Sequence, residues 1–271
     1  MGDEILKEQI LQFWNRESCG TVYAQGSSEK EKYDTHTKAR YELEPYLPVF
    51  AEFPSGAGKD ILEIGVGMGA DHVEWAKSRP KSLTGVDLTP LAVEHTTRRL
   101  SIYGLESKVQ VADAENLPFD DDSFDLVYSW GVLHVSPDTQ KTINEVHRVL
   151  RKGGLAKIMI YSKYSVVGYM LWLRYGLLRG KPFRSLDDIY WHHLESPGTK
   201  AYTIEQTERM FAKFSEAEIK PQLSFGDLLK GAVGQRHRGL ILNLAKALWP
   251  RWLIKRFFAN HGLYVLITAR K

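Results

Sequence analysis

The residues most able to do chemistry lie in the short segment 60–71. It begins with an apolar run that carries Glu63 near its end, and three glycines follow at alternate positions, Gly65, Gly67 and Gly69. This pattern is typical of a buried strand that turns sharply into a helix whose N-terminus faces a ligand. Glycine suits such a turn because it accepts positive φ and lets another molecule approach the backbone closely.

The glycine loop alone fits more than one adenosine-containing cofactor. Gly65, Gly67 and Ala70 also satisfy the dinucleotide fingerprint G-x-G-x-x-G/A. Asp87 lies about 20 residues further on, which is the spacing expected of an acid that binds a ribose. A nicotinamide dinucleotide and a different adenosine cofactor are therefore both open at this point.

Strands and helices alternate around this loop. Thr89-Pro90 is a good helix start and Gly104 a stop signal. The spacing of strand, helix and strand predicts a parallel sheet with helices on both faces. The expected strands lie at 61–66, 82–87, 109–113, 124–130 and 155–161, and the helices between them at 71–78, 90–103 and 137–150.

The pattern changes after residue 162. Residues 163–203 are apolar and aromatic and then polar, and they predict a lid over the carboxyl ends of the strands, where α/β proteins bind ligands. A helix at 204–214 and two closing strands at 219–225 and 263–269 follow. The expected fold is α/β, with a Rossmann-like, doubly wound, mostly parallel seven-stranded sheet and an α-helical lid. The expected domains are 1–53 as an N-terminal helical cap, 54–162 as the core, 163–203 as the lid and 204–271 as the C-terminal part of the core.

Composition is that of a globular protein with a sizeable core, since 43% of the 271 residues are hydrophobic and 25% are charged. Cys19 is the only cysteine, which excludes an internal disulfide and a multi-cysteine metal site and fits a reducing cytosol. The N-terminus lacks the features of a secretion signal, and the longest apolar stretch, 166–178, is too short to span a bilayer and contains Arg174. We expect a cytoplasmic protein in which Cys19 is an ordinary thiol.

The net charge of +3 is unevenly distributed. From Lys230 to Lys271 there are nine Lys or Arg and no acid, which leaves −6 for the first 229 residues. An aromatic, basic segment of this kind can lie on an anionic membrane surface, although Pro250 divides it. Peripheral membrane contact and packing on the core both stay open, and nucleic acid is disfavoured because no RNA-binding module is evident. The aromatic and basic residues alternate within 240–258 and are Lys246, Trp249, Arg251, Trp252, Lys255, Arg256, Phe257 and Phe258.

Several motifs follow one another in a fixed order over roughly 58–162. They are Glu63-x-Gly65-x-Gly67-x-Gly69, Asp87, Asp113-Ala114 and Phe124-Asp125-Leu126-Val127 through Trp130-x-Val132-Leu133-His134. Together they resemble a class I S-adenosylmethionine-dependent methyltransferase. The run at 145–154, which ends in Arg151-x-Gly153-Gly154, is similar to the small-molecule, ubiquinone-type branch of that family.

The chemistry of the loop favours this cofactor over a dinucleotide. A dinucleotide places its pyrophosphate at the helix N-terminus. S-adenosylmethionine has no phosphate, and carries a sulfonium cation and a zwitterionic tail. Glu63 would repel a pyrophosphate but suits a positively charged neighbour. The resemblance thus implies S-adenosyl-L-methionine as cofactor and S-adenosyl-L-homocysteine as product.

The resemblance also implies roles for the residues of the first two strand ends. Glu63 lies near the methionine moiety, and Gly65, Gly67 and Gly69 let the loop pass beneath the methionine and the ribose. Asp87 accepts both ribose hydroxyls in a charge-assisted contact.

The resemblance implies that the residues that come next contact the adenine and the site of methyl transfer. Leu88 packs on one face of the adenine. Asp113 accepts the adenine amino group, and the Ala114 amide reaches a ring nitrogen. Trp130 contacts the cofactor through its backbone and forms a wall for the substrate, with core packing as its alternative.

Two histidines are candidate catalytic residues. His134 follows the fourth strand, and a histidine of near-neutral pKa can take a proton from a hydroxyl, an amine or an acidic carbon. Enzymes of this family also act by positioning two reactants for in-line displacement, which leaves His134 a packing or hydrogen-bonding role. His193 in the lid is an equal candidate. We expect no metal site there, because the adjacent His192 and His193 point in different directions.

The N-terminal residues Tyr23, Tyr33, His36 and Arg40 either close over the cofactor or belong to a helix laid on the domain. A tyrosine ring favours a sulfonium cation, and Arg40 could reach the methionine carboxylate.

Aromatic residues of the lid indicate what accepts the methyl group. They favour a small, apolar or aromatic acceptor, and leave open whether oxygen, nitrogen or carbon is attacked. Two alternatives remain, a membrane-associated lipid or quinone as the acceptor, and a non-catalytic regulatory protein that binds S-adenosylmethionine. The lid aromatics are Tyr164, Tyr169, Trp172, Tyr175 and Phe183.

Overall fold

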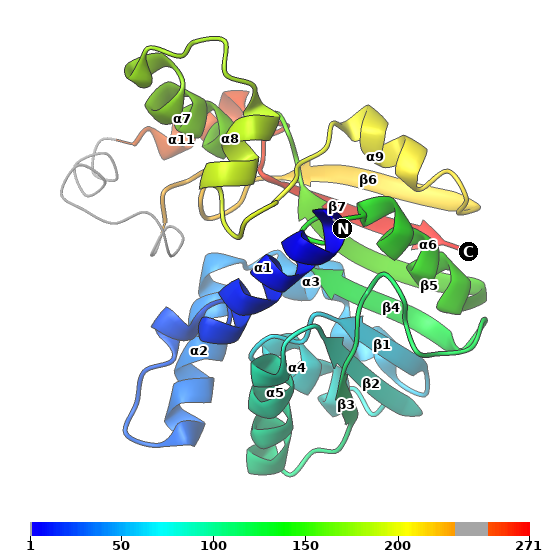
Figure 1. Ribbon diagram of the computed structural model, residues 1–271. Helices are drawn as coiled ribbons and strands as arrows, with labels where there is room; N and C mark the ends of the chain where they lie inside the picture. Colours follow the sequence, from blue (N-terminus) through cyan, green and yellow to red (C-terminus); the bar gives the residue numbers. More distant parts are fainter. Residues whose placement is uncertain (1, 231–248) are drawn as a thin grey trace.

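The computed structural model describes residues 2–230 and 249–271. Its centre is a seven-stranded sheet with the strand order β3-β2-β1-β4-β5-β7-β6 (Figure 1). Strands β1 to β5 pair in parallel, and β7 is antiparallel to both β5 and β6. The predicted α/β fold with a mostly parallel seven-stranded sheet is confirmed. The strands are β1 (Asp60–Ile64), β2 (Ser82–Asp87), β3 (Lys108–Val111), β4 (Phe124–Trp130), β5 (Leu150–Tyr161), β6 (Glu216–Gln222) and β7 (Tyr264–Arg270).

Each face of the sheet has its own hydrophobic core, because neighbouring residues of a strand point to opposite faces. On one face, Leu62 and Val127 share a core with α6 (Thr139–Val149). On the other face, Ile61 and Leu126 share a core with α3 (Leu47–Ala51) and α4 (Ala70–Lys77). Burial on both faces explains why β1 and β4 are nearly continuous apolar runs.

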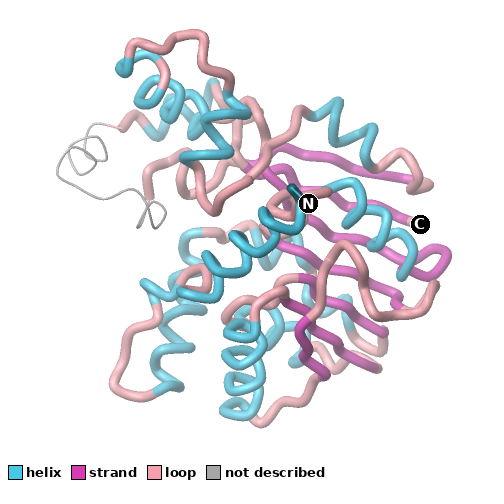
Figure 2. The backbone as a smooth tube through the Cα atoms, in the orientation of Figure 1, coloured by secondary structure: helices cyan, strands magenta, loops and turns pink. Residues whose placement is uncertain are grey.

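The N-terminal helices lie against the core of the sheet. Leu6 and Ile10 of α1 (Gly2–Arg16) pack against Val135, which follows β4, and Trp14 and Leu88 join the same cluster. Helix α1 therefore lies across the chain that leaves β2 and β4, as the tube in Figure 2 also shows. Other helices of this half are η1 (Thr21–Tyr23), α2 (Glu29–Leu43), η2 (Phe53–Gly56) and α5 (Pro90–Tyr103).

Two predicted boundaries shift for local reasons. The helix predicted from residue 137 begins at Thr139, because the Asp138 side chain caps it by accepting the Lys141 amide at 3.0 Å. Strand β5 begins at Leu150 and not at the predicted residue 155, because Leu150 already pairs with Phe124. The ladder shifts register before it resumes at Leu155.

The lid forms a further hydrophobic core on the sheet. Val167, Leu171 and Ile189 pack together with Met159 and Tyr264 of β5 and β7. Its last helix spans residues 186–193, and the helix predicted at 204–214 ends at residue 210. The elements are α7 (Val166–Tyr175), η3 (Leu177–Arg179), α8 (Leu186–His193) and, after the lid, α9 (Ile204–Met210).

Helix α11 (Arg251–Phe257) follows Pro250 and packs on the lid, where Ile254 shares a cluster with Val166 of α7. Residues 240–248 of the predicted basic aromatic segment, Lys246 among them, lie outside the described residues. None of the helices that the structure describes has the length and apolarity needed to cross a membrane.

Candidate cofactor and acceptor site

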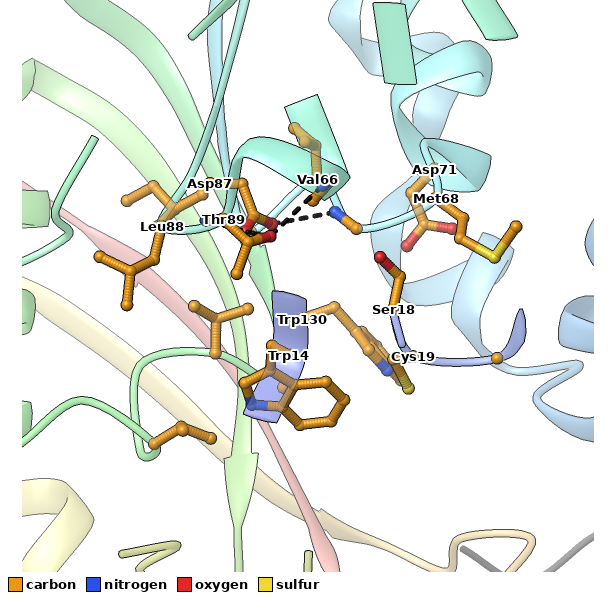
Figure 3. A pocket seen from close by; sticks show the side chains of 18 of the residues that line it. Trp14, Ser18, Cys19, Val66, Met68, Asp71, Asp87, Leu88, Thr89 and Trp130 are labelled. Atoms are coloured by element: carbon orange, nitrogen blue, oxygen red, sulfur yellow. Dashed lines mark hydrogen bonds between the residues drawn. The ribbon is translucent and has the colours of Figure 1, made fainter. Parts of the chain in front are cut away.

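A cavity of about 290 Å³ lies where the chain leaves β1, β2, β3 and β4. Its wall combines the residues after these strands with residues of α1, α2 and the lid. The carboxyl ends of parallel strands meet at one edge of a sheet, so loops distant in sequence converge there. Figure 3 shows the cavity, with Asp87, Leu88 and Thr89 on one side and Trp14 and Cys19 nearby.

The turn after β1 depends on glycine at two positions. Gly65 has a φ of 85°, and a Cβ added there would lie 2.1 Å from Cγ2 of Val132. Gly67 has a φ of 53°, and a Cβ added there would meet no atom within 4 Å, which leaves room beside the backbone. Both glycines line the cavity, whereas Gly69 caps α4 outside the cavity wall and faces Thr96.

Asp87 stands at the end of β2 with its carboxylate held by backbone and side-chain donors. The Gly67 amide donates to Oδ2 at 3.1 Å, and the amide and hydroxyl of Thr89 donate to Oδ1 at 2.9 Å each (Figure 3). A carboxylate offers about four acceptor sites, so Oδ2 can accept a further donor. Burial raises the pKa of Asp87 against the lowering effect of these bonds.

The acid after β3 is tied to α1. Asp113 accepts the Glu115 amide at 2.9 Å and the Lys7 ammonium at 2.6 Å, and Lys7 also reaches Glu115 at 2.9 Å. Burial would lower the pKa of Lys7, but the two carboxylates raise it. Asp113 and Ala114 both line the cavity. No local pattern indicates Lys7, which lies 106 residues from its partner in the chain.

Glu63 lines the cavity from the end of β1 and is almost fully buried. Its Oε2 lies 2.8 Å from Nδ1 of His72, and Nε2 of that ring lies 2.8 Å from the Ser107 hydroxyl. Burial raises the pKa of Glu63 well above its usual value and lowers the pKa of His72 to about 3. Burial thus disfavours the charged form of each group, and a positively charged ligand beside Glu63 would favour its carboxylate form.

Arg40 of α2 lines the cavity and is fixed by Asp71 in the first turn of α4. Its Nε and Nη2 donate to the two carboxylate oxygens at 2.8 and 2.6 Å, and Tyr128 donates to the same carboxylate at 2.8 Å. Burial would raise the pKa of Asp71, but Arg40 lowers it. The guanidinium lies 5.9 Å from the ring centre of Trp130.

Of the other N-terminal candidates, Tyr23 and His36 line the cavity. Burial and the nearby Arg99 lower the pKa of His36 to about 3. Tyr33 is buried outside the cavity wall, and its hydroxyl donates to the His95 carbonyl at 3.2 Å. Helix α2 thus contributes to the cavity and also packs on the domain.

Beyond β4 the wall becomes aromatic. Trp130, Tyr161 and Tyr264 line this end, and the rings of the two tyrosines stack at 5.8 Å. Two carboxylates accompany them. Tyr161 donates to Oε2 of Glu195 at 2.9 Å, and Glu44 lies buried with Arg40 Nη1 at 3.6 Å from its Oε2. Burial raises the pKa of Glu44 against the pull of that arginine.

Cys19 also lines the cavity. Its side chain is exposed to solvent, and the protein groups around it, with Glu195 nearby, raise the pKa of its thiol to about 12. The side chain is therefore a neutral thiol at physiological pH and not a nucleophilic thiolate.

The order of the strands sets the order of these groups. Asp113 follows β3, Asp87 follows β2, the glycine loop follows β1 and Trp130 ends β4, and the sheet runs β3-β2-β1-β4. An elongated ligand along this edge would meet Asp113, Asp87, the glycine loop and Trp130 in turn, which is the order in which the resemblance predicts contacts to the adenine, the ribose, the methionine moiety and the acceptor. The residues present therefore fit a molecule built as adenine, ribose and an amino-acid tail with a cation between the last two.

Comparison with known proteins agrees with this geometry. The family described as "Methyltransferase domain" matches residues 62–158, from β1 into β5. The fold is similar to geranyl diphosphate C-methyltransferase from Streptomyces coelicolor, with a TM-score of 0.59, 15% identity and coverage of 98% of this chain and 97% of that one. Residues 62–158 thus match a methyltransferase domain, and the fold around them is one that class I S-adenosylmethionine-dependent methyltransferases share. A methyltransferase domain of this fold implies S-adenosylmethionine as the methyl donor.

Two curated relatives are more similar to part of the chain in sequence. The phthiotriol/phenolphthiotriol dimycocerosates methyltransferase of Mycobacterium leprae is 43% identical over 100 residues, which are 36% of each chain. The fatty-acid O-methyltransferase of Mycolicibacterium smegmatis is 39% identical over 116 residues, 42% of this chain and 41% of the relative. The chain thus matches well under half the length of these relatives. The ubiquinone-type branch stays a prediction.

Neither predicted catalytic histidine lies in the wall of this methyltransferase cavity. His134 is fully buried with its ring 4.0 Å from that of Tyr161, and neither ring nitrogen has a hydrogen-bond partner among the described residues. Burial lowers the pKa of His134 to about 3, so it packs as an uncharged ring. His193 stacks on Tyr175 at 3.9 Å, with Arg184 Nη1 2.9 Å from its Nε2. His134 therefore makes packing contacts, and His193 makes packing and hydrogen-bonding contacts, both outside the cavity wall.

The five lid aromatics proposed as acceptor contacts also lie outside the cavity wall. Phe183 is 99% exposed and Tyr164 52% exposed, while Trp172 donates to the Pro182 carbonyl at 3.2 Å. The interpretation of the lid aromatics as acceptor contacts is therefore corrected. They pack within the lid or face outward, because α7 is apolar on several faces and only some of these face the sheet. The aromatic side chains that line the cavity come from outside that set and are Trp14, Tyr23, Trp130, Tyr161, Phe225 and Tyr264.

Proposed function

We propose that the chain is a methyltransferase that moves the methyl group of S-adenosylmethionine to an oxygen atom of an apolar, hydroxyl-bearing acceptor. The observation that carries this proposal is the far end of the cavity, where aromatic rings surround the Tyr161–Glu195 pair. Such a wall suits an apolar ligand with a single polar group. The names of the two relatives, one a fatty-acid O-methyltransferase, support an oxygen atom and a lipid-like acceptor.

Positioning is the main contribution of the chain to this reaction. When bound, S-adenosylmethionine supplies an electrophilic methyl group with a neutral thioether as its leaving group. The aromatic wall formed by Trp130, Tyr161 and Tyr264 orients the acceptor and keeps water from the reacting oxygen. Holding two reactants in line replaces a bimolecular encounter by an intramolecular step, which is worth several orders of magnitude in rate.

Glu195 is the proton acceptor in this proposal. The Tyr161 hydroxyl donates to its Oε2, which fixes the carboxylate at the cavity, and a carboxylate keeps acceptor capacity beyond one such bond. The acceptor hydroxyl passes its proton to Glu195 as its oxygen forms the new bond to the methyl carbon. The carbon–sulfur bond breaks with its electron pair on sulfur, so charge and atoms balance.

Labelled S-adenosylmethionine and a set of acceptors test the proposal. The set pairs a long-chain alcohol and an apolar phenol with the amines of the same carbon skeleton, and mass spectrometry locates the methyl group. Methylation of the alcohol or phenol supports the proposal. Methylation of the amines alone would overturn the choice of oxygen. Tight cofactor binding without transfer to any acceptor would favour a non-catalytic regulatory protein.

The role of Glu195 has a matched control. Glu195→Gln should lower kcat by about 100-fold or more, because a general base contributes roughly that factor, and should leave cofactor affinity intact. Glu205→Gln removes an exposed carboxylate on α9 and should not change kcat. A Glu195→Gln enzyme as fast as Glu205→Gln would show that positioning alone suffices.

A further inference from the structure

Exposed apolar side chains gather at the lid end of the molecule. Of the thirteen large hydrophobic residues exposed in the described ranges, nine lie within 164–193 or 249–258. Phe183 is 99% exposed, Leu178 73% and Trp252 71%. Monomeric proteins rarely gather such residues without a partner, since each exposes apolar area that burial would stabilise.

These residues belong to one structural unit. Helix α11 packs on α7 through Ile254 and Val166, and the Tyr169 hydroxyl lies 2.9 Å from Nδ1 of His261 just beyond α11. Figures 1 and 2 show α7, α8 and α11 together at one end, away from β2 and β3. We call this region the lid-end surface, and its exposed apolar residues include Leu177, Leu178, Phe183, Trp191, Trp252 and Phe257.

The lid-end surface is strongly basic. Residues 164–193 and 249–258 contain seven Lys or Arg and two Asp, a net charge of +5, whereas the whole chain carries +3. The two aspartates already pair within the lid, Asp187 with Lys163 and Asp188 with Arg184. Lys255 and Arg256 of α11 are exposed and form no ion pair with any acid among the described residues. A partner for this surface must therefore carry negative charge and provide an apolar region into which these side chains can insert.

We propose that the lid-end surface docks on an anionic lipid bilayer. Tryptophan and phenylalanine insert at the boundary between headgroups and acyl chains, and basic residues pair with anionic headgroups. A second copy of the chain is disfavoured because two faces of charge +5 would repel each other. The proposal needs neither turnover nor an oxygen-bearing acceptor, so it can fail or hold independently of the proposed function.

The surface and the cavity are joined by α8. Trp191 belongs to the lid-end surface, and Glu195 lines the cavity four residues further along the chain. A lipid-like acceptor leaving the bilayer would thus have a short path to the cavity. This consequence rests on the proposed function, whereas membrane docking itself does not.

Vesicle sedimentation tests the proposal with the full chain and no cofactor. Vesicles of phosphatidylcholine are compared with vesicles that contain roughly one-third phosphatidylglycerol. The protein should sediment with the anionic vesicles, and the bound fraction should fall as salt rises. Lys255→Gln should weaken this binding about fivefold, the effect of one basic group near an anionic surface. Leu178→Ser should weaken vesicle binding as well, because it removes an apolar side chain that would insert into the bilayer.

Two matched variants control for general effects. Lys108→Gln removes an exposed lysine of β3 at the opposite edge of the sheet, and Val49→Ser changes a residue of α3 that is 75% exposed. Neither should alter vesicle binding. The proposal is overturned if neutral vesicles bind equally well, or if Lys255→Gln and Leu178→Ser behave like their controls. A concentration-dependent dimer in solution that Leu178→Ser abolishes would instead identify a second copy as the partner.

Discussion

Replacement of Asp87 by asparagine tests the cofactor site most directly. The carboxylate accepts the Gly67 amide on Oδ2 and both donors of Thr89 on Oδ1, which leaves Oδ2 to accept a ribose hydroxyl. In Asp87→Asn one oxygen becomes an NH₂ group, which cannot accept. The amide must either face a backbone N–H or turn its donors toward the ribose, and the negative charge is lost in both cases.

The size of the effect follows from this geometry. A hydrogen bond to a charged group is worth about 1.5–3 kcal/mol, so loss of the bond at Oδ2 should weaken binding about 10- to 150-fold. S-adenosylmethionine and S-adenosylhomocysteine should lose the same factor, because they share the ribose. Titration calorimetry with both ligands measures it, and NAD serves as the unrelated dinucleotide.

The pH dependence gives a second readout. Burial raises the pKa of Asp87, so the carboxylate becomes protonated at a higher pH than an ordinary aspartate as the solution is acidified. Affinity for the cofactor should fall through that range in the wild type and stay flat in Asp87→Asn. Thr89→Val keeps the carboxylate and should cost less than about threefold. Wild-type affinity in a folded Asp87→Asn protein would remove Asp87 from the ribose site.

Three further predictions concern the loop, the buried histidine and the base of the sheet. Gly65→Ala should lower the melting temperature and cofactor affinity together, because the new Cβ meets Val132; Val132→Ala should restore part of the loss, and no rescue would refute the clash. His134→Phe should keep kcat within about threefold, since the buried ring has no hydrogen-bond partner among the described residues and the substitution removes no such bond. A loss of kcat of about 100-fold with intact cofactor binding would restore His134 as a base. Asp60→Asn should cost about 2 kcal/mol of unfolding free energy at pH 7, because bonds from Ser82, Arg151 and Lys81 hold the pKa of Asp60 below its usual range. Stability of that kind is present above the unfolded pKa of about 4 and is lost below it, so denaturant titrations should show a shrinking cost as pH falls; a constant cost would contradict this account.

The sequence predicted the fold well because its signals are local. Buried strands are apolar runs, helix starts carry caps such as Thr89, and the turn after β1 needs glycine at Gly65. Once the strands are parallel, topology brings their carboxyl ends together, so Asp87 and Asp113 could be placed at one edge without coordinates. Whether these residues bind the cofactor as predicted is for the binding experiments to decide.

Contacts between distant segments could not be predicted. Nothing near Lys7 indicates that it meets Asp113 or that α1 covers the chain leaving β4. The position of His134 after β4 did not reveal that its ring turns into the core against Tyr161. A helix that is apolar on most sides, such as α7, does not show which face it buries, which is why its aromatics were assigned to the acceptor.

Different parts of the chain are expected to set the specificity for the methyl donor and for the acceptor. The groups predicted to hold the cofactor lie within residues 62–158, the part that matches the methyltransferase family. Much of the proposed acceptor end lies outside that range, since Glu44, Glu195, Phe225 and Tyr264 come from the N-terminal part, the lid, the segment after β6 and β7. Similarity confined to the matched part therefore constrains the methyl donor much more than the acceptor. An exchange of residues 62–158 for those of a relative should leave acceptor preference largely unchanged, whereas substitutions at these four positions should alter it.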